Sequence, residues 1–262
     1  MTPPVAILSP HLDDAVLSCW HVLTSPADVR VVNVFAGVPS ANVAPGWWDT
    51  SSGRHDPVRT VKERIEEDRT ALALIGRDPV NLDFLDNQYR SGPQAIEPMV
   101  DAVLGILPWG AVVWAPGAFA PQAGHMTDRG ARREPHPDHV AVRSAALALR
   151  AKGYAVALYA DLPHASVCGW PDWVINDGDS GRGRRAAELW RAGLAAARLA
   201  PVQLIPEVRR LSPVAFERKA QAVQRYASQV ATIEHAIGRR LDDPELLGYE
   251  VAWRLPAVEA AS

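Results

Sequence analysis

The sequence has few cysteines, no long apolar run and no excess of basic residues. Cys19 and Cys168 are the only two cysteines among 262 residues, which is too few for the disulfide framework of a small secreted scaffold. They also lack the paired spacing of a zinc-binding cysteine motif. We therefore interpret both as small hydrophobic residues of a packed core.

Further absences narrow the class of protein. No segment approaches the roughly 18 consecutive apolar residues that a membrane helix needs. The start, MTPPVAILSPH, lacks the basic region and apolar stretch of a signal peptide. The formal net charge is −3 and the pI is near 6.2, so no basic surplus favours nucleic acid. We predict a cytoplasmic protein that has no membrane span and does not bind nucleic acid; a homo-oligomer is left open.

The sequence does contain alternating strand-like and helix-like segments. A 48% hydrophobic composition can fill one sizeable core, so residues 1–262 are predicted to form a single domain. Short β-rich runs predict strands at 5–8, 28–37, 80–86, 111–116, 154–161 and 249–255. Because helical segments alternate with these runs, we predict an α/β fold with a Rossmann-like, mostly parallel sheet and helices on both faces.

The apolar spacing typical of a helix is clear in five segments and weaker in a sixth. Apolar spacing predicts helices at 13–23, 57–76, 93–107, 139–153 and 212–238. Residues 185–200 have a weaker apolar stripe, and 166–185 are expected to be a loop or two short strands. The long loop at 38–57 holds Trp47 and Trp48, which could line a pocket or pack the loop down.

Two polar motifs follow predicted strands. His11, Asp13 and Asp14 come after the first strand, and His136 and His139 come after the fourth. In open parallel sheets, ligands bind at these carboxyl ends. Adjacent carboxylates repel each other and are costly to desolvate, but a cation would offset both effects. Two imidazoles and one carboxylate would make a three-ligand site for Zn²⁺, with Fe²⁺, Mn²⁺ or Co²⁺ as alternatives, and the other aspartate would be free to act as a base.

Each motif also has a plainer interpretation. Asp13 and Asp14 could cap an exposed helix N-terminus, and Asp138 could cap another. Taken singly, these interpretations are favoured. The two motifs at matching strand ends of one α/β chain favour a shared metal site instead.

At this point the sequence resembles the PIG-L or LmbE-like family of zinc-dependent de-N-acetylases. Residues 10–15 read PHLDDA, close to the family's (P/A)HPDDE, and residues 136–139 read HPDH, the family's HxDH. Arg64 and Glu67 before an LALIG ending match its middle helix. Lys219 and Gln229 fall in a segment similar to its final helix. The resemblance spans most of the chain.

The resemblance implies a role for each residue of the two motifs. It implies that His11, Asp14 and His139 bind zinc and that Asp13 is the general base. His136 would polarise or protonate the reacting centre, with Asp138 as its orienting partner.

Two further residues are candidates for substrate binding. The resemblance places Arg64 against substrate hydroxyls, whereas a surface salt bridge to Glu67 or Asp68 is the plainer alternative. Asp86 ends the third predicted strand and could reach the pocket, but it could equally cap a turn.

The sequence departs from the family pattern at two positions. Ala15 replaces the usual Glu, which removes a supporting carboxylate, and Glu134 stands where some members carry a Tyr. The expected reaction is still hydrolysis of the N-acetyl or another N-acyl group of an amino sugar or glycoconjugate. Two alternatives are a non-haem iron oxygenase with a two-His, one-carboxylate triad and a non-catalytic sugar-binding module. Such triads usually sit on all-β barrels, so the alternation of strands and helices favours the hydrolase over the oxygenase. Every proposed catalytic position is filled, which argues against the binding module.

Overall fold

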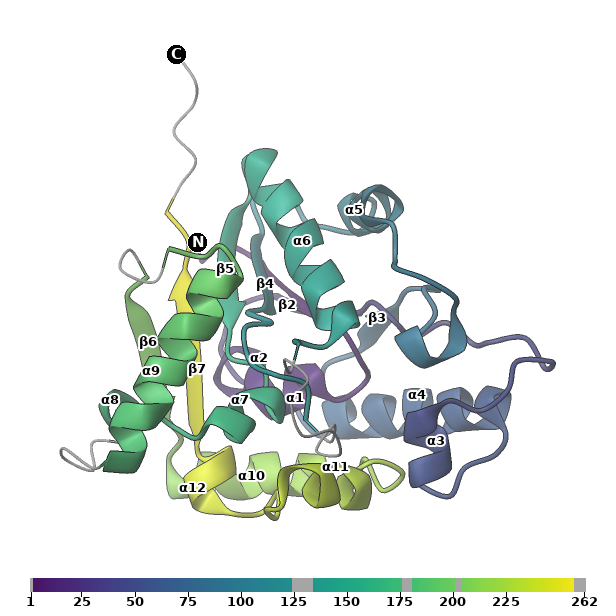
Figure 1. The fold of residues 1–262 in the computed structure, drawn as a ribbon. Coiled ribbons are helices and arrows are strands. Elements are labelled where there is room, and N and C mark those ends of the chain that lie inside the picture. Colours follow the sequence, from purple (N-terminus) through teal and green to yellow (C-terminus); the bar gives the residue numbers. More distant parts are fainter. Residues whose placement is uncertain (1, 124–133, 176–180, 201–203, 257–262) are drawn as a thin grey trace.

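A seven-stranded sheet forms the centre of the molecule (Figure 1), in the order β3-β2-β1-β4-β5-β7-β6. The computed structural model describes residues 2–123, 134–175, 181–200 and 204–256. From β3 to β5 all neighbouring strands are parallel, whereas β7 runs antiparallel to both β5 and β6. The strands are β1 (Val5–Ser9), β2 (Val29–Asn33), β3 (Pro79–Asn81), β4 (Val112–Pro116), β5 (Ala155–Tyr159), β6 (Pro206–Arg210) and β7 (Tyr249–Arg254). The predicted mostly parallel α/β fold is confirmed.

Helices cover both faces of the sheet. Helices α5 and α6 pack against each other on one face, and α4 and α10 lie on the other (Figure 1). The helices are α1 (Asp14–Ser18), α2 (Trp20–Leu23), α3 (Trp47–Ser51), α4 (Pro57–Ala73), α5 (Ile96–Leu104), α6 (Pro137–Ala151), α7 (His164–Cys168), α8 (Asp172–Ile175), α9 (Gly181–Ala196), α10 (Pro213–Val223), α11 (Val230–Ile237) and α12 (Pro244–Leu247), with a 3₁₀ turn η1 (Asn87–Tyr89).

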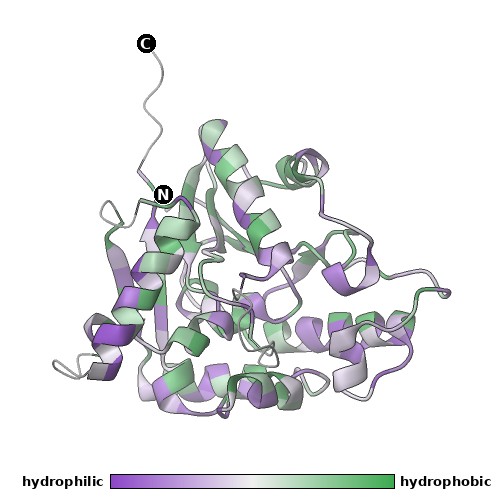
Figure 2. Cartoon of the chain, viewed as in Figure 1, coloured by the Kyte–Doolittle hydropathy of each residue, from purple (hydrophilic) through white to green (hydrophobic). Residues whose placement is uncertain are grey.

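The core lies between the sheet and these helices. All five residues of β1 are buried, as expected for a central strand covered on both faces, and Figure 2 shows the central strands coloured hydrophobic. Cys19 is fully buried in this core, while Cys168 is only partly buried. Within the described part of the chain, no helix is long and apolar enough to cross a membrane.

Two predicted helices are each divided in the structure: residues 13–23 form α1 and α2, and residues 212–238 form α10 and α11. Residues 212–238 were expected to be continuous, but α10 ends at Val223 and α11 starts at Val230. Between them the main chain and hydroxyl of Ser228 donate to the carboxylate of Glu67 at 2.7 and 2.6 Å. Tyr226 donates its hydroxyl to Asp68 at 2.7 Å. The main-chain N–H of Ser228 therefore bonds to α4 and not to a carbonyl of its own helix, so a tertiary contact overrides the local helical pattern.

Other segments also differ from expectation. Residues 166–185, expected to be a loop or short strands, contain helix α8 and parts of α7 and α9 where they are described; residues 176–180 of this segment lie outside the described chain. The edge strand β6 was missed because its sequence, PEVRR, is mostly charged. The third strand is shorter than expected, ending at Asn81.

The sheet brings the two polar motifs together. Strand β1 pairs with β2 on one side and with β4 on the other, both in parallel. The first and fourth strands of the chain are therefore neighbours, and the two motifs that follow them lie side by side. This position, where the winding of the sheet reverses, is the place at which open α/β sheets bind ligands.

Candidate metal centre and active site

The turn after β1 holds the first motif in a fixed shape. The hydroxyl of Ser9 donates to the carbonyl of His11 at 2.6 Å and accepts the main-chain N–H of Ala15 at 3.0 Å. The main-chain N–H of His11 donates to Asp14 Oδ2 at 2.8 Å. The second motif opens α6, where Pro137 takes the first helical position. Across the gap, the His11 and His139 rings lie 5.2 Å apart.

Three of these side chains fit a metal ion. Oδ2 of Asp14 lies 3.4 Å from His11 Nδ1 and 3.4 Å from His139 Nε2. A tetrahedral site with metal–ligand bonds of about 2.0–2.2 Å separates its ligand atoms by about 3.3–3.6 Å. His139 Nε2 is buried without a hydrogen-bond partner, which is costly unless something else binds it. The donor set therefore fits a divalent cation held by His11, Asp14 and His139.

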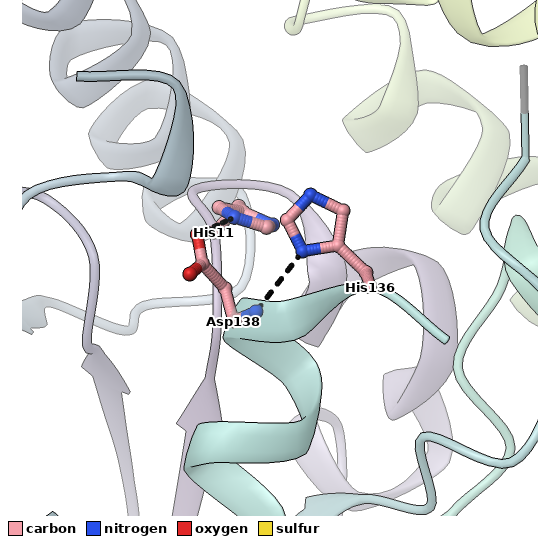
Figure 3. Close-up of side chains that lie close together, drawn as sticks. All are labelled: His11, His136 and Asp138. Carbon is pink, nitrogen blue, oxygen red and sulfur yellow. Dashed lines mark hydrogen bonds and ion pairs between the residues drawn. The ribbon is translucent and has the colours of Figure 1, made fainter. Parts of the chain in front are cut away.

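Each histidine of this trio has a carboxylate on its other nitrogen. Asp161 Oδ2 lies 2.9 Å from His139 Nδ1, and Asp138 Oδ2 lies 3.1 Å from His11 Nε2 (Figure 3). Such carboxylates fix which nitrogen of a ligating histidine carries the proton and make the other a better ligand. Two aspartates thus support the metal ligands, although Ala15 has replaced the family's usual glutamate.

Asp138 was expected to orient His136, but its carboxylate does not contact that ring. Its carboxylate is held by His11, by Arg90 and by the main-chain N–H of Asn87 at 2.9 Å. Only its main-chain N–H reaches His136, donating to Nδ1 at 3.2 Å (Figure 3). The carboxylate therefore orients His11, whereas the N-terminus of α6 orients His136.

His136 is set up as a neutral hydrogen-bond donor. Because Nδ1 accepts a hydrogen bond, the proton of the neutral ring is on Nε2, which points away from Asp138 (Figure 3). Burial and the nearby charges of His11 and His139 keep the pKa of His136 well below its usual value. A neutral imidazole N–H can stabilise a negative oxygen as it develops.

The two adjacent aspartates have opposite pKa shifts. Burial and the negative charge of Asp14 raise the pKa of Asp13 to about 7. Burial also disfavours the Asp14 anion, but the charge of His139 and the hydrogen bond to His11 outweigh it and lower the pKa of Asp14 to about 2. Asp14 is thus held as an anion, the form that binds metal, while Asp13 can gain or lose a proton near neutral pH.

A cavity of about 300 Å³ opens above these groups. One part of its wall is polar and another is apolar, a common arrangement in small-molecule sites. The lining includes His11, Asp13, Asp14, His136, His139, Arg64, Asp86, Gln88, His164 and Gln229, together with Leu12, Phe35, Trp47, Trp48, Val61 and Ile233. Asp138 is fully buried.

Both candidate substrate residues border the cavity. Arg64 is buried, and its partner is Asp49, at 3.0 Å from Nη2, rather than Glu67 or Asp68. The surface salt bridge considered as an alternative is therefore wrong. Asp86 lines the cavity and also caps η1, accepting the main-chain N–H of Gln88 at 3.0 Å, so both interpretations of Asp86 hold.

Several residues at the site were missed by sequence reasoning. Asp161 ends the predicted strand 154–161 and lies two residues after β5, so the rule that singled out Asp86 at a strand end could have found it. His164 lies three residues later, and its Nδ1 accepts the main-chain N–H of Ala123 at 3.1 Å. Arg90 and Asp49 had no signal, because only tertiary contacts pair them with Asp138 and Arg64. Glu134 is exposed, so it does not replace the missing Tyr inside the cavity.

Solved structures with this fold are known. A deacetylase triple mutant from the teicoplanin biosynthetic pathway is 26% identical, with a TM-score of 0.66 over 96% of this chain and 97% of that one. The zinc-inhibited form of teicoplanin deacetylase Orf2 is 25% identical, with a TM-score of 0.64 over 96% and 97%. The A40926 pseudoaglycone deacetylase Dbv21 shares the fold at 24% identity, with a TM-score of 0.65 over 99% and 100%. No protein-family model and no curated protein matches the chain.

The predicted resemblance to the PIG-L/LmbE de-N-acetylases is confirmed. The enzyme is a hydrolase of the deacetylase class, and its His/Asp cluster indicates a divalent metal. The structural match to the teicoplanin-pathway deacetylase extends over 96% of this chain.

Proposed function

We propose that the protein is a zinc-dependent deacetylase that removes an N-acetyl or related N-acyl group from an amino sugar within a glycoconjugate. The observation that carries this proposal is the pair of 3.4 Å separations around Asp14 Oδ2. They match the spacing of a tetrahedral nitrogen and oxygen site, and they leave Asp13 beside that site without a ligand role. Teicoplanin deacetylase Orf2, which shares the fold, is described in a zinc-inhibited form.

Asp13 and His136 have different roles in the proposed amide hydrolysis. When bound, a divalent cation lowers the pKa of water toward neutrality and polarises an amide carbonyl. Asp13 takes the proton of the attacking water, and His136 donates Nε2–H to the carbonyl oxygen as negative charge builds there. Asp13 then returns the proton to the leaving nitrogen as the C–N bond breaks. Asp13 lines the cavity beside the proposed metal ligands, where it can reach both the water and the leaving nitrogen.

The polar wall of the cavity supports binding of a sugar. Arg64 carries charge and Asp86 carries acceptor oxygens, and hydroxyl groups are able to pair with both. Arg64 is also close enough to Asp13 for its positive charge to lower the pKa of Asp13, whereas burial raises that pKa. We assign both residues to the sugar, with Arg64 placed nearer to the reacting amide.

The test is a panel of N-acylated amino sugars assayed for release of free amine. The protein would be stripped of metal, then reloaded with zinc from below one equivalent to excess, because excess zinc could inhibit. Turnover that needs about one equivalent of zinc supports the proposal. Oxygen consumption that depends on Fe²⁺ would favour an oxygenase, and sugar binding without turnover would favour a binding module.

A further inference from the structure

Strand β6 leaves one edge of the sheet open. Among the described strands it pairs only with β7, and it ends the sheet on that side (Figure 1). The main-chain N–H of Leu211 donates to the carbonyl of Gly248 at 2.9 Å, so Leu211 faces β7. Residues that face the partner alternate with residues that face away in an antiparallel ladder. The main-chain N–H groups of Val208 and Arg210 therefore point to the open edge.

The proline of β6 agrees with this alternation. Pro206 falls in the same set as Val208, so the N–H that it lacks is on the open edge, where β7 loses no bond. Short, charged edge strands that contain proline commonly keep two copies of a protein from pairing. The sequence PEVRR prevents pairing only if like charges meet across the edge.

Opposite charges meet instead when a second copy of β6 pairs antiparallel about Val208. In that register Glu207 lies opposite Arg209 of the second copy, and Arg209 lies opposite its Glu207. These are pairs without main-chain bonds, whose Cα atoms approach to about 4.5 Å, so their side chains interact. The Arg209 guanidinium is exposed and has no carboxylate partner among the described residues. Glu207 also pairs with Arg254 of its own chain at 2.6 Å.

The charges of β6 also select this register over its neighbours. A slip of two residues in either direction keeps the outward N–H groups in use. One such slip puts Arg209 opposite Arg209 of the second copy, and the other puts Glu207 opposite its Glu207. Like charges directly opposite each other are destabilising. Pairing about Val208 is therefore the favourable choice among the three registers.

An exposed apolar side chain borders the same edge. Ile205 immediately precedes β6 and is 83% exposed. Pairing about Val208 places Ile205 beside Leu211 of the second copy, a residue that packs in part against the core. The pairing thus removes apolar surface from water. Because β6 is only five residues long, the contact is small, and small interfaces are usually weak and transient.

We propose that β6 is the interface of a weak two-fold dimer, in which a second copy of this chain adds its own β6 antiparallel about Val208. The two sheets then form one continuous sheet. The active-site cavity follows β1 and β4, and β5 and β7 separate these strands from β6. Both cavities therefore stay open, and the inference does not depend on the proposed deacetylase function.

The first test is sedimentation equilibrium of the full chain from about 1 to about 300 μM. We expect the mean mass to rise from 28.4 kDa toward twice that value. Val208→Pro removes the outward N–H without removing a bond to β7, and it should weaken the dimer at least about tenfold. Val208→Thr keeps this N–H and the β-branched shape, so it should still dimerise. Circular dichroism shows whether each variant is folded.

The second test uses charge reversals of the facing pair. Glu207→Arg puts Arg opposite Arg, and Arg209→Glu puts Glu opposite Glu, so each variant alone should be monomeric. An equal mixture of the two variants should form a heterodimer, because every facing pair then has opposite charges. Arg225→Glu, an exposed reversal after α10, is the matched control and should dimerise like the wild type.

Three results would overturn the inference. A wild-type chain that stays monomeric at every concentration would show that β6 is a protected edge. A dimer that persists in Val208→Pro or in either charge reversal would use another surface. A mixture of the two reversals that stays monomeric would exclude pairing about Val208.

Discussion

Asp161 holds His139 in the orientation that a metal ligand needs. Its Oδ2 lies 2.9 Å from His139 Nδ1, while its Oδ1 accepts the main-chain N–H of Ala118 at 3.1 Å. When His139 is neutral, its proton is thereby kept on Nδ1. The lone pair of Nε2, which faces Asp14, is then available to bind a metal ion. The carboxylate of Asp161 therefore holds both the main chain at Ala118 and the ring of His139.

Replacing this carboxylate should weaken metal binding without unfolding the protein. In Asp161→Asn the amide oxygen can still accept from Ala118, but its NH₂ group faces His139 and favours the wrong tautomer. We expect zinc affinity to fall by about 10- to 100-fold, measured by competition with a chelator. Asp242→Asn, at an exposed position, is the control. Unchanged zinc affinity in Asp161→Asn would mean that Asp161 has only a structural role.

The adjacent aspartates should respond differently to substitution. Asp14→Ala removes a proposed ligand and should lose both zinc and activity. Asp13→Asn keeps the size of the side chain but cannot take a proton, so it should retain zinc while turnover falls by roughly 10²–10⁴. Metal analysis of the purified variants, alongside kcat, makes the comparison. An active Asp13→Asn, or one that loses zinc while Asp14→Ala keeps it, would reverse the assigned roles.

Arg64→Ala should affect the protein in two ways. Removing the guanidinium leaves the fully buried Asp49 without its cation, which should destabilise the protein by about 3–5 kcal/mol. It also removes a proposed contact to the sugar, so KM should rise while zinc content is kept. Urea unfolding, metal analysis and steady-state kinetics measure the three quantities. Arg59→Ala, on the exposed side of the same helix, should change none of them, and an unaltered KM in Arg64→Ala would remove Arg64 from the substrate site.

A buried ion pair should make stability depend on pH in the acid range. Lys219 Nζ lies 2.7 Å from Glu250 Oε1, and both side chains are almost completely buried. Burial disfavours the Glu250 anion, but Lys219 and His21 outweigh it and lower the pKa of Glu250 to about 2. Since the pKa of the folded state is below the unfolded value of 4.5, the stabilisation is present above about pH 4.5 and is lost as the pH falls toward 2.

Two variants test this pair. Lys219→Met leaves Glu250 buried without its cation and should cost about 3–5 kcal/mol at neutral pH, measured by urea unfolding, whereas Arg218→Met at the exposed neighbouring position should not. Glu250→Gln should lose stability less steeply than the wild type between pH 4.5 and 2. An equal slope in both proteins would show that Glu250 does not contribute to acid unfolding.

The sequence by itself determined the central sheet and the two polar motifs. Apolar β-rich runs such as VAIL at 5–8 are strong local signals, because a strand covered on both faces needs continuous hydrophobic residues. The positions of His11 and His136 at strand ends then followed from the general rule for parallel sheets. The local hydrophobic pattern and the order of segments along the chain were therefore enough to predict the central strands and the positions of the two motifs.

Tertiary structure alone decided the partners of these residues. The helical pattern of 212–238 is continuous, yet Ser228 and Tyr226 bond to α4 and divide it. Asp138 looked like the partner of His136, but its carboxylate lies against His11. Such contacts join residues far apart in the chain, and their energies depend on burial and alignment, which neither propensity nor spacing encodes. The sequence therefore specified the chemical groups at the site, and only the folded chain specified which group each of them meets.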